Sequence, residues 1–88
     1  MELTDEIIAE ISYVQSSKYR KRVMESLVDG VKIPSQIAKD SDIRQAHISN
    51  ILKQLKEHEL VECINPEVKK GRLYRHTDKG VKIVKNIR

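Results

Sequence analysis

Apolar residues recur at the spacing of α-helices over most of this chain, with one interruption after residue 59. The first of them lie three or four positions apart, at Leu3, Ile7, Ile11 and Val14. Thr4 is a favourable N-cap, and the acidic residues that follow it suit the positive end of a helix. This pattern predicts a first helix within residues 1–15.

A second helix is expected directly after the first. Ser17 can cap it, and Gly30 can end it in the left-handed conformation that glycine adopts easily. Its apolar positions are Tyr19, Val23 and Leu27.

Two helices joined by a tight turn come next. Pro34 is favourable as a first helical residue, because the N–H that proline lacks would be unpaired there. Asp40 and Asp42 can each bond the local backbone, which predicts the turn. The second helix of the pair is expected from about Arg44 to His58, with a buried stripe of Ile48, Ile51, Leu52 and Leu55.

The period then changes from helical to β. Residues 60–64 and 73–76 are rich in β-prone side chains, and turn-forming residues lie between them, which predicts a hairpin with a long basic tip. Thr77 and Asp78 can cap a last helix with an apolar stripe at Val81, Val84 and Ile87. The predicted fold class is therefore α+β, mainly α: a winged helix-turn-helix with a two-stranded β-hairpin wing and flanking N- and C-terminal helices.

A chain of 88 residues has the size of one domain. We expect residues 1–88 to form a single winged helix-turn-helix domain, with its core at about 17–80 and flanking helices at 1–15 and 78–88. The net charge is +4, from 17 Lys+Arg and 13 Asp+Glu, yet residues 1–15 contain acidic residues and neither Lys nor Arg. The basic excess therefore lies in the rest of the chain, as expected for a protein that binds a polyanion.

The sequence also indicates a compartment. No apolar run approaches the ~18 residues of a membrane helix, and the acidic start lacks the features of a signal peptide. The single Cys63 cannot form an internal disulfide, which fits a reducing compartment. We expect a cytoplasmic protein without membrane contact.

The longer helix of the central pair leaves a polar face opposite its apolar stripe. Asn and Gln can each make two hydrogen bonds to adenine, Ala can contact a thymine methyl group, and Lys or Arg can reach phosphate or guanine. We therefore predict a recognition helix for double-stranded DNA, formed by Arg44, Gln45, Ala46, His47, Ser49, Asn50 and Lys53.

Two further segments are candidate DNA contacts. The predicted wing offers four cations to phosphates or to the minor groove: Lys69, Lys70, Arg72 and Arg75. Ser35 and Gln36, at the start of the helix that precedes the recognition helix, can hydrogen bond to the DNA backbone.

Several of these segments resemble a known family, the archaeal-type and ArsR/MarR-like winged-helix regulators. The segments are Ile33–Ala38, Ile48–Leu55, Leu60–Val61, Gly71–Tyr74 and Thr77–Gly80. The resemblance spans roughly residues 17–80. It implies a homodimer that binds a pseudo-palindromic operator, usually to repress transcription. Its DNA-facing positions correspond to Gln45, Ala46, His47, Ser49, Asn50 and Lys53.

The sequence departs from this family pattern at two places. Glu59 stands where the family usually has Gly before the Leu-Val that opens the hairpin, and a left-handed Glu costs about 1 kcal/mol. Arg44 stands at the usual Ser cap of the recognition helix, which leaves Asp42 as an alternative cap one turn earlier.

The terminal helices carry more apolar residues than so small a core needs, which predicts a homodimer interface. The residues concerned are Leu3, Ile7, Ile8, Ile11, Ile83, Val84 and Ile87.

The sequence contains no pattern of a catalytic, cofactor or metal site. The three glycines are isolated, so no phosphate-cradling loop is expected, and one Cys with three scattered His gives no metal-ligand spacing. Cys63, His76, Tyr19 and Tyr74 are interpreted as structural residues. We expect no enzyme activity, no cofactor, no metal and no small-molecule ligand.

The alternative function is a winged helix that docks proteins within a larger complex, with weak or no DNA binding. Such a module should expose apolar residues on the recognition face.

Overall fold

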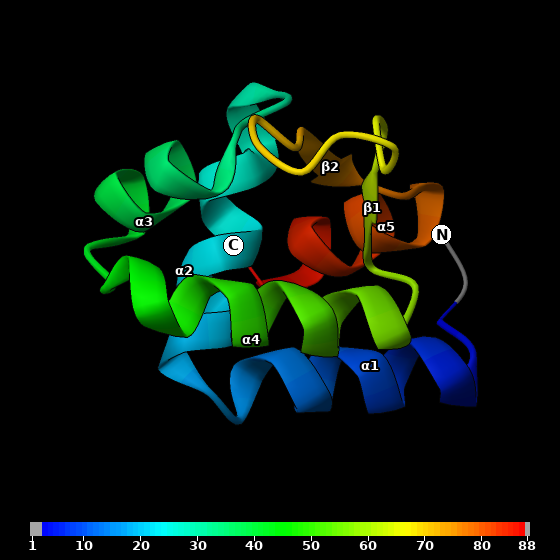
Figure 1. Ribbon diagram of the computed structural model, residues 1–88. Helices are drawn as coiled ribbons and strands as arrows, with labels where there is room; N and C mark the ends of the chain where they lie inside the picture. Colours follow the sequence, from blue (N-terminus) through cyan, green and yellow to red (C-terminus); the bar gives the residue numbers. More distant parts are fainter. Residues whose placement is uncertain (1–2, 88) are drawn as a thin grey trace.

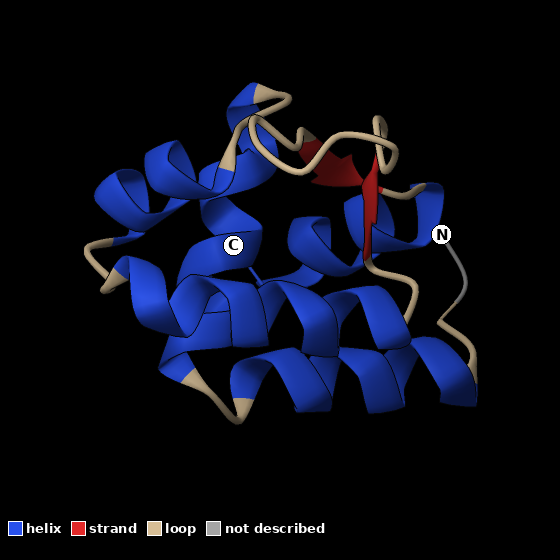
Figure 2. Cartoon of the chain, in the orientation of Figure 1, coloured by secondary structure: helices blue, strands red, loops and turns tan. Residues whose placement is uncertain are grey.

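The computed structural model describes residues 3–87. Figures 1 and 2 show a helix-rich chain with one short antiparallel hairpin. The elements within these residues are α1 Asp5–Gln15, α2 Lys18–Ser26, the 3₁₀ helix η1 Leu27–Asp29, α3 Pro34–Ser41, α4 Gln45–Glu57, β1 Val61–Cys63, β2 Tyr74–His76 and α5 Asp78–Ile87.

Helix α2 forms the centre of the arrangement, because it contacts α1, α3, α4 and α5. Helix α5 packs against α1, α2 and β2, whereas α4 contacts α2, α3 and β1. The hairpin and its loop lie at the top of Figure 1, above α4. No helix within residues 3–87 is long and apolar enough to cross a membrane.

Local capping chemistry explains where several helices start, as predicted. Thr4 Oγ1 accepts a hydrogen bond from the N–H of Ile7 at 3.2 Å, and Thr77 Oγ1 accepts one from the N–H of Gly80 at 3.0 Å. Pro34 is the first residue of α3. Each cap satisfies an amide that would otherwise lack a partner in the first turn.

The end of α2 differs from the prediction. Ser17 caps the helix as expected, with its Oγ accepting the N–H of Arg20 at 3.3 Å. The α-helix stops at Ser26, however, and a 3₁₀ turn continues to Asp29. Gly30 then adopts φ +126° and ψ −156°, an extended conformation at positive φ rather than the predicted left-handed cap. Glycine adopts this conformation readily because it has no Cβ.

The turn between α3 and α4 lies later than predicted. Helix α3 includes Asp40, whose carboxylate accepts a hydrogen bond from Lys32 Nζ at 2.7 Å rather than from the local backbone. Asp42 is left-handed, with φ 55°, and it ends α3. Asp42 is therefore not an early cap of the recognition helix. Helix α4 begins after Arg44, whose side chain makes no capping bond.

The hairpin starts from a left-handed residue, as the sequence suggested. Glu59 has φ 59°, its N–H donates to the carbonyl of Lys56 at 2.9 Å, and its own carbonyl accepts from Thr77 Oγ1 at 2.6 Å. These bonds offset a strain of about 1 kcal/mol. Val61 then lies opposite His76 in the antiparallel register.

One backbone contact of strand β2 was not predicted from the sequence. The backbone of Lys32 donates to Tyr74 at 3.1 Å and accepts from it at 2.9 Å, so the segment before α3 forms an isolated β-bridge to the two-stranded hairpin. This contact joins the base of the wing to the start of the helix-turn-helix.

The core is aliphatic and draws on every helix. Its fully buried members include Val14, Val23, Met24, Ile37, Ile48, Leu55, Leu60 and Ile83. His76 lies half-buried at its edge, where Nε2 donates to the carbonyl of Met24 at 2.7 Å. Burial lowers the pKa of His76, although this hydrogen bond acts in the opposite direction. The structural role expected for His76 agrees with this position.

The predicted dimer surface needs a correction at α5. Ile83, Val84 and Ile87 are 0%, 5% and 6% exposed, so they belong to the protein's own core and offer no surplus apolar surface. Helix α5 can approach the hairpin closely because Gly80 packs against the carbonyl of Leu60, where a Cβ would lie only 2.0 Å from the oxygen. Of the predicted stripe, Val84 and Ile87 are buried, but Val81 is 38% exposed and Ile83 takes its place in the core.

Candidate nucleic-acid interface

Helix α4 presents its predicted polar face to the surface. Its apolar stripe is buried: Ile48, Ile51, Leu52 and Leu55. Every residue predicted for the recognition helix is exposed: Arg44, Gln45, Ala46, His47, Ser49, Asn50 and Lys53. The structure therefore leaves the amide, hydroxyl and amine groups of this face available to a partner, as base-edge recognition requires.

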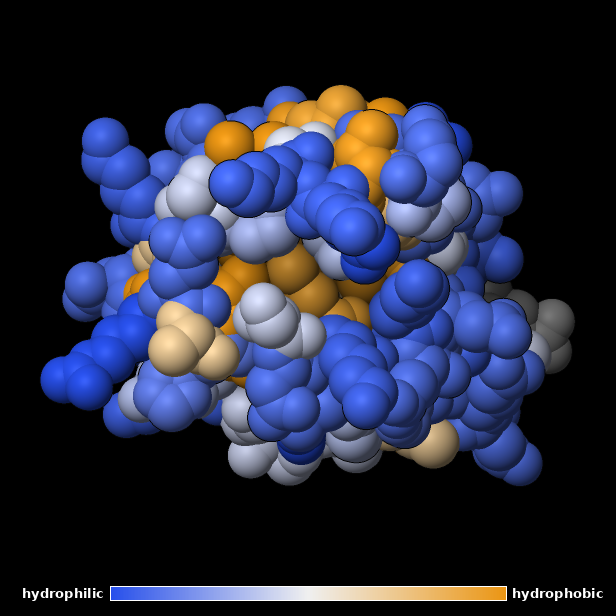
Figure 3. Space-filling view, viewed as in Figure 1, coloured by the Kyte–Doolittle hydropathy of each residue, from blue (hydrophilic) through white to orange (hydrophobic). Residues whose placement is uncertain are grey.

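A groove of about 680 Å³ separates α4 from the wing. Ile33, Leu52 and Tyr74 are among the residues that line it, and Figure 3 shows a hollow with an apolar floor between the hydrophilic surfaces of α4 and of the wing. The polar residues that line it come from three elements: Ser35 from α3, Gln45, Ser49, Lys53 and Lys56 from α4, and Lys69, Lys70 and Arg72 from the wing. Two separate cationic segments thus border one concave surface.

The loop of the wing is closed by its own hydrogen bonds. Asn65 Nδ2 donates to the carbonyl of Gly71 at 3.1 Å, and Asn65 Oδ1 accepts from the N–H of Leu73 at 2.7 Å. Gly71 has φ +70°, which a side chain would disfavour. Arg72 Nε donates to the carbonyl of Val68 at 2.7 Å, so part of this guanidinium is held by the loop. The Arg72 charge at the tip therefore has a defined position.

Lys69 and Lys70 are two cations of the wing loop, which also carries one acidic residue, Glu67. Both are exposed, and within residues 3–87 neither forms an ion pair. Their charge is therefore not neutralised locally.

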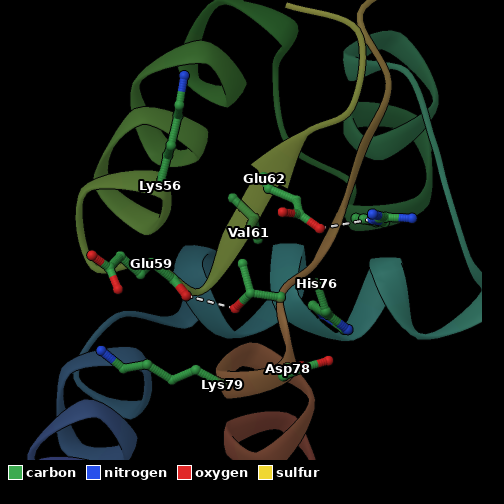
Figure 4. A pocket seen from close by; sticks show the side chains of 9 residues that line it. Lys56, Glu59, Val61, Glu62, His76, Asp78 and Lys79 are labelled. Atoms are coloured by element: carbon green, nitrogen blue, oxygen red, sulfur yellow. Dashed lines mark hydrogen bonds and ion pairs between the residues drawn. The ribbon is translucent and has the colours of Figure 1, made fainter.

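Arg75 was predicted with the wing cations, but it lies apart from them. Its Nε is 2.8 Å from Glu62 Oε2, an ion pair that the dashed line at Glu62 marks in Figure 4. Arg75 lines a different depression of about 860 Å³, which also contains Lys56, Glu59, Asp78 and Lys79. Because the strand alternates its side chains, Arg75 points away from Tyr74 and from the groove. Charges of both signs line this second depression, so it does not favour a polyanion.

Ser35 and Gln36 occupy the first turn of α3, as predicted, and both are exposed. Only Ser35 borders the groove. Sequence reasoning did not include Lys56, although its position three residues after Lys53 and seven after Ser49 places it on the same side of α4. The helical spacing was therefore a sufficient signal for Lys56.

Tyr19 is a second residue whose position was not predicted. We expected a core role, but its side chain is 42% exposed, whereas Tyr74 is half-buried and packs against the core. Cys63 is also half-buried, with Sγ 3.6 Å from Asn65 Oδ1. In residues 3–87, His, Cys, Asp and Glu side chains form no group of three that could hold a metal ion.

The fold has counterparts among solved structures, although no family model and no curated sequence matches the chain. A MarR family transcription regulator superposes with a TM-score of 0.72 at 21% identity, over 90% of this chain and 56% of that one. A MarR family transcriptional regulator from Silicibacter pomeroyi gives 0.70 at 22% identity, over 94% and 62%. A double-mutant form of ZitR from Lactococcus lactis gives 0.61 at 20% identity, over 93% and 68%.

These matches confirm the predicted winged helix-turn-helix fold. The chain spans only 56% and 62% of the length of the first two structures. The resemblance to archaeal-type and ArsR-like regulators rests on sequence segments alone and stays a prediction.

Proposed function

We propose that this chain binds double-stranded DNA and regulates transcription. The observation that carries the proposal is the groove in which the exposed polar face of α4 meets the basic wing. A helix with such a face fits the major groove, and a neighbouring basic hairpin reaches phosphates or the minor groove. The folds of the MarR-family regulators support the same function.

The two segments have different roles in this proposal. Asn50, Gln45 and Ser49 carry groups of fixed geometry on a helix, and these specify bases. Lys69, Lys70 and Arg72 carry charge, and they position the protein on the phosphates.

The proposed regulator is a homodimer that acts as a repressor, as the sequence resemblance implies. Support for a dimer comes from α1, where Leu3 is 44% and Ile8 48% exposed, with Ile7 and Ile11 half-buried beside them. Two-fold symmetry through α1 would present two recognition helices to one DNA. Sedimentation equilibrium should give about twice the 10.2 kDa chain mass, and Ile8→Lys should reduce it to the monomer mass. A monomeric native chain would refute the dimer.

The experiment for DNA binding starts from duplexes selected out of random DNA and compares them with random duplexes by fluorescence anisotropy. If the protein makes about six phosphate contacts, its affinity should fall by about 10³-fold or more when the salt concentration rises from 50 to 200 mM. Asn50→Ala should cost about 1–3 kcal/mol on the selected duplex and much less on random DNA. The double variant Lys70→Ala, Arg72→Ala should weaken binding to both duplexes equally and lower the salt slope by about two for each protomer bound.

Lys82→Ala is the matched control, since it removes an exposed charge from α5, away from the groove. It should change neither affinity nor slope appreciably. If Asn50→Ala weakened both duplexes equally, α4 would not be the recognition helix. No salt-dependent binding at all would refute the proposal.

One observation favours the alternative of protein docking. Val31, Ile33 and Ile64 are 44%, 36% and 41% exposed, and they lie at the base of the wing and in the adjoining segment. A module that docks proteins would use such aliphatic side chains. A flat salt response in the titration would support this function.

A further inference from the structure

Helix α4 has two flanks, and the wing covers only one of them. Successive residues of a helix are rotated by about 100°. Gln45, Ser49 and Lys56 share the flank that borders the wing. His47 and Gln54 share the opposite flank, where Arg20 Nη1 donates to Gln54 Oε1 at 3.3 Å. This second flank therefore faces α2.

A separate depression of about 760 Å³ lies on the α2 flank. Tyr19 of α2, Lys39 of α3, the exposed Arg44 directly before α4 and the exposed His47 of α4 meet around it. Lys18 Nζ lies 5.8 Å from the centre of the Tyr19 ring, which adds a third cation beside the depression. One carboxylate, Asp42, also lines it, so positive charge remains in excess.

The acidic residues of α1 do not neutralise this surface. They lie in the first part of the helix, and Glu6 and Glu10 pair with Lys79 and His58 at the other end of α4. The segment of α1 that leads to α2, residues 12–17, carries no charged side chain. The field of the three cations is therefore open to a partner.

A helix in the major groove is bordered by phosphates on both sides. The groove is about 12 Å wide, and a helix with its side chains measures about 10–12 Å, so both strands approach its flanks. The wing supplies cations to one strand only. The depression lies where the other strand would pass.

We propose that Lys18, Tyr19, Lys39 and Arg44 form a second phosphate-binding surface, which holds the DNA strand across the major groove from the wing. This inference rests on the proposed function. The Tyr19 hydroxyl donates to a phosphate oxygen, and the three cations replace the counterions of that strand. The ring of Tyr19 also limits the positions that the Lys18 ammonium can adopt.

The test uses the same selected and random duplexes with the double variant Lys18→Ala, Lys39→Ala. Both side chains are exposed, so the fold should persist, which circular dichroism can verify. Binding to both duplexes should weaken by similar factors, on the order of tenfold, and the salt slope should fall by about two for each protomer bound. Tyr19→Phe keeps the ring and should cause a smaller loss on both duplexes. The matched control is Lys82→Ala, Lys85→Ala on α5, which removes the same charge from exposed positions and should leave the slope unchanged.

Phosphate-ethylation interference locates the loss. In each half-site the native protein should show two clusters of essential phosphates, one on each strand, and Lys18→Ala, Lys39→Ala should abolish one of them. Lys70→Ala, Arg72→Ala should abolish the other. If the α2-flank variant keeps the native salt slope and both clusters, the second surface is refuted while the proposed function stands. If the native chain itself binds no DNA, both are refuted.

Discussion

The two terminal helices have similar amphipathic sequences but different positions in the structure. Helix α5 buries Ile83, Val84 and Ile87, with Ile83 at 0% exposure, and leaves only Val81 of its large apolar residues exposed, at 38%. Helix α1 fully buries only Val14, and Ile8 remains 48% exposed. An apolar stripe therefore shows that a helix has a partner surface, but not whether that surface belongs to the same chain.

Helix α1 lacks a large buried apolar face. Polar contacts attach it to the rest of the protein instead. Glu10 is 3.0 Å from His58 Nδ1, and the His58 ring stacks on Tyr13 with 3.7 Å between centroids. Lys79 Nζ is 3.1 Å from Glu6 and 3.7 Å from Glu10. Burial acts to lower the pKa of Lys79, but the bond to Glu6 and the nearby carboxylates outweigh it and raise the pKa. These contacts leave Ile8 on the outer side of α1 uncovered.

The difference arises from Gly80 and the hairpin. Because Gly80 has no Cβ, α5 can approach the backbone of Leu60 and insert its stripe between α2 and β2. Helix α1 has no glycine and contacts only α2 and α5 extensively.

The largest expected effect comes from truncating one isoleucine on each helix. Ile83→Ala should lower the free energy of unfolding by about 2–5 kcal/mol, because it leaves a cavity in the core. Ile8→Ala should change it by less than about 0.5 kcal/mol in the monomer. Urea denaturation at low protein concentration measures both. Equal losses would contradict the comparison, whereas a loss for Ile8→Ala that grows with protein concentration would report a dimer contact.

The second prediction concerns the close approach of α5. Ala usually stabilises a helix by about 1 kcal/mol relative to Gly. At Gly80 the sign should reverse, and Gly80→Ala should destabilise the protein by about 2–3 kcal/mol, because the added methyl group would collide with the Leu60 carbonyl. Thermal denaturation, with Lys82→Ala as a control on the same helix, distinguishes the two outcomes. A stabilised Gly80→Ala variant would show that α5 is not held this tightly.

The smallest effect is a loss of stability in acid that should arise at His76, beside α5. Burial lowers the pKa of His76 in the folded protein. His76 therefore takes up a proton near pH 6.5 in the unfolded chain, whereas in the folded protein it is still neutral at that pH. Stability should be complete above that pH and should decline as the pH falls toward the lower folded pKa. Denaturation curves between pH 8 and 5 measure it. His76→Gln should remove this decline.

The sequence alone determined the features that depend on neighbouring residues. Thr4, Pro34 and Thr77 start helices because each acts on amides within one turn, and the change of period after Glu59 reflects side chains that suit a strand. The outward face of α4 follows from helical spacing in the same way, so Asn50 could be placed without a structure. Local chemistry was sufficient for each of these.

The tertiary structure decided what depends on distant segments. The Lys32–Tyr74 backbone contact and the pairing of Arg75 with Glu62 join residues that are far apart in the chain. The exposure of Tyr19 depends on which helix lies beside it. The burial of Ile83 and the exposure of Ile8 also depend on distant segments, because both residues belong to apolar patterns with helical spacing. Burial is set by the surface that packs against a residue, and a periodic pattern contains no information about which surface that is.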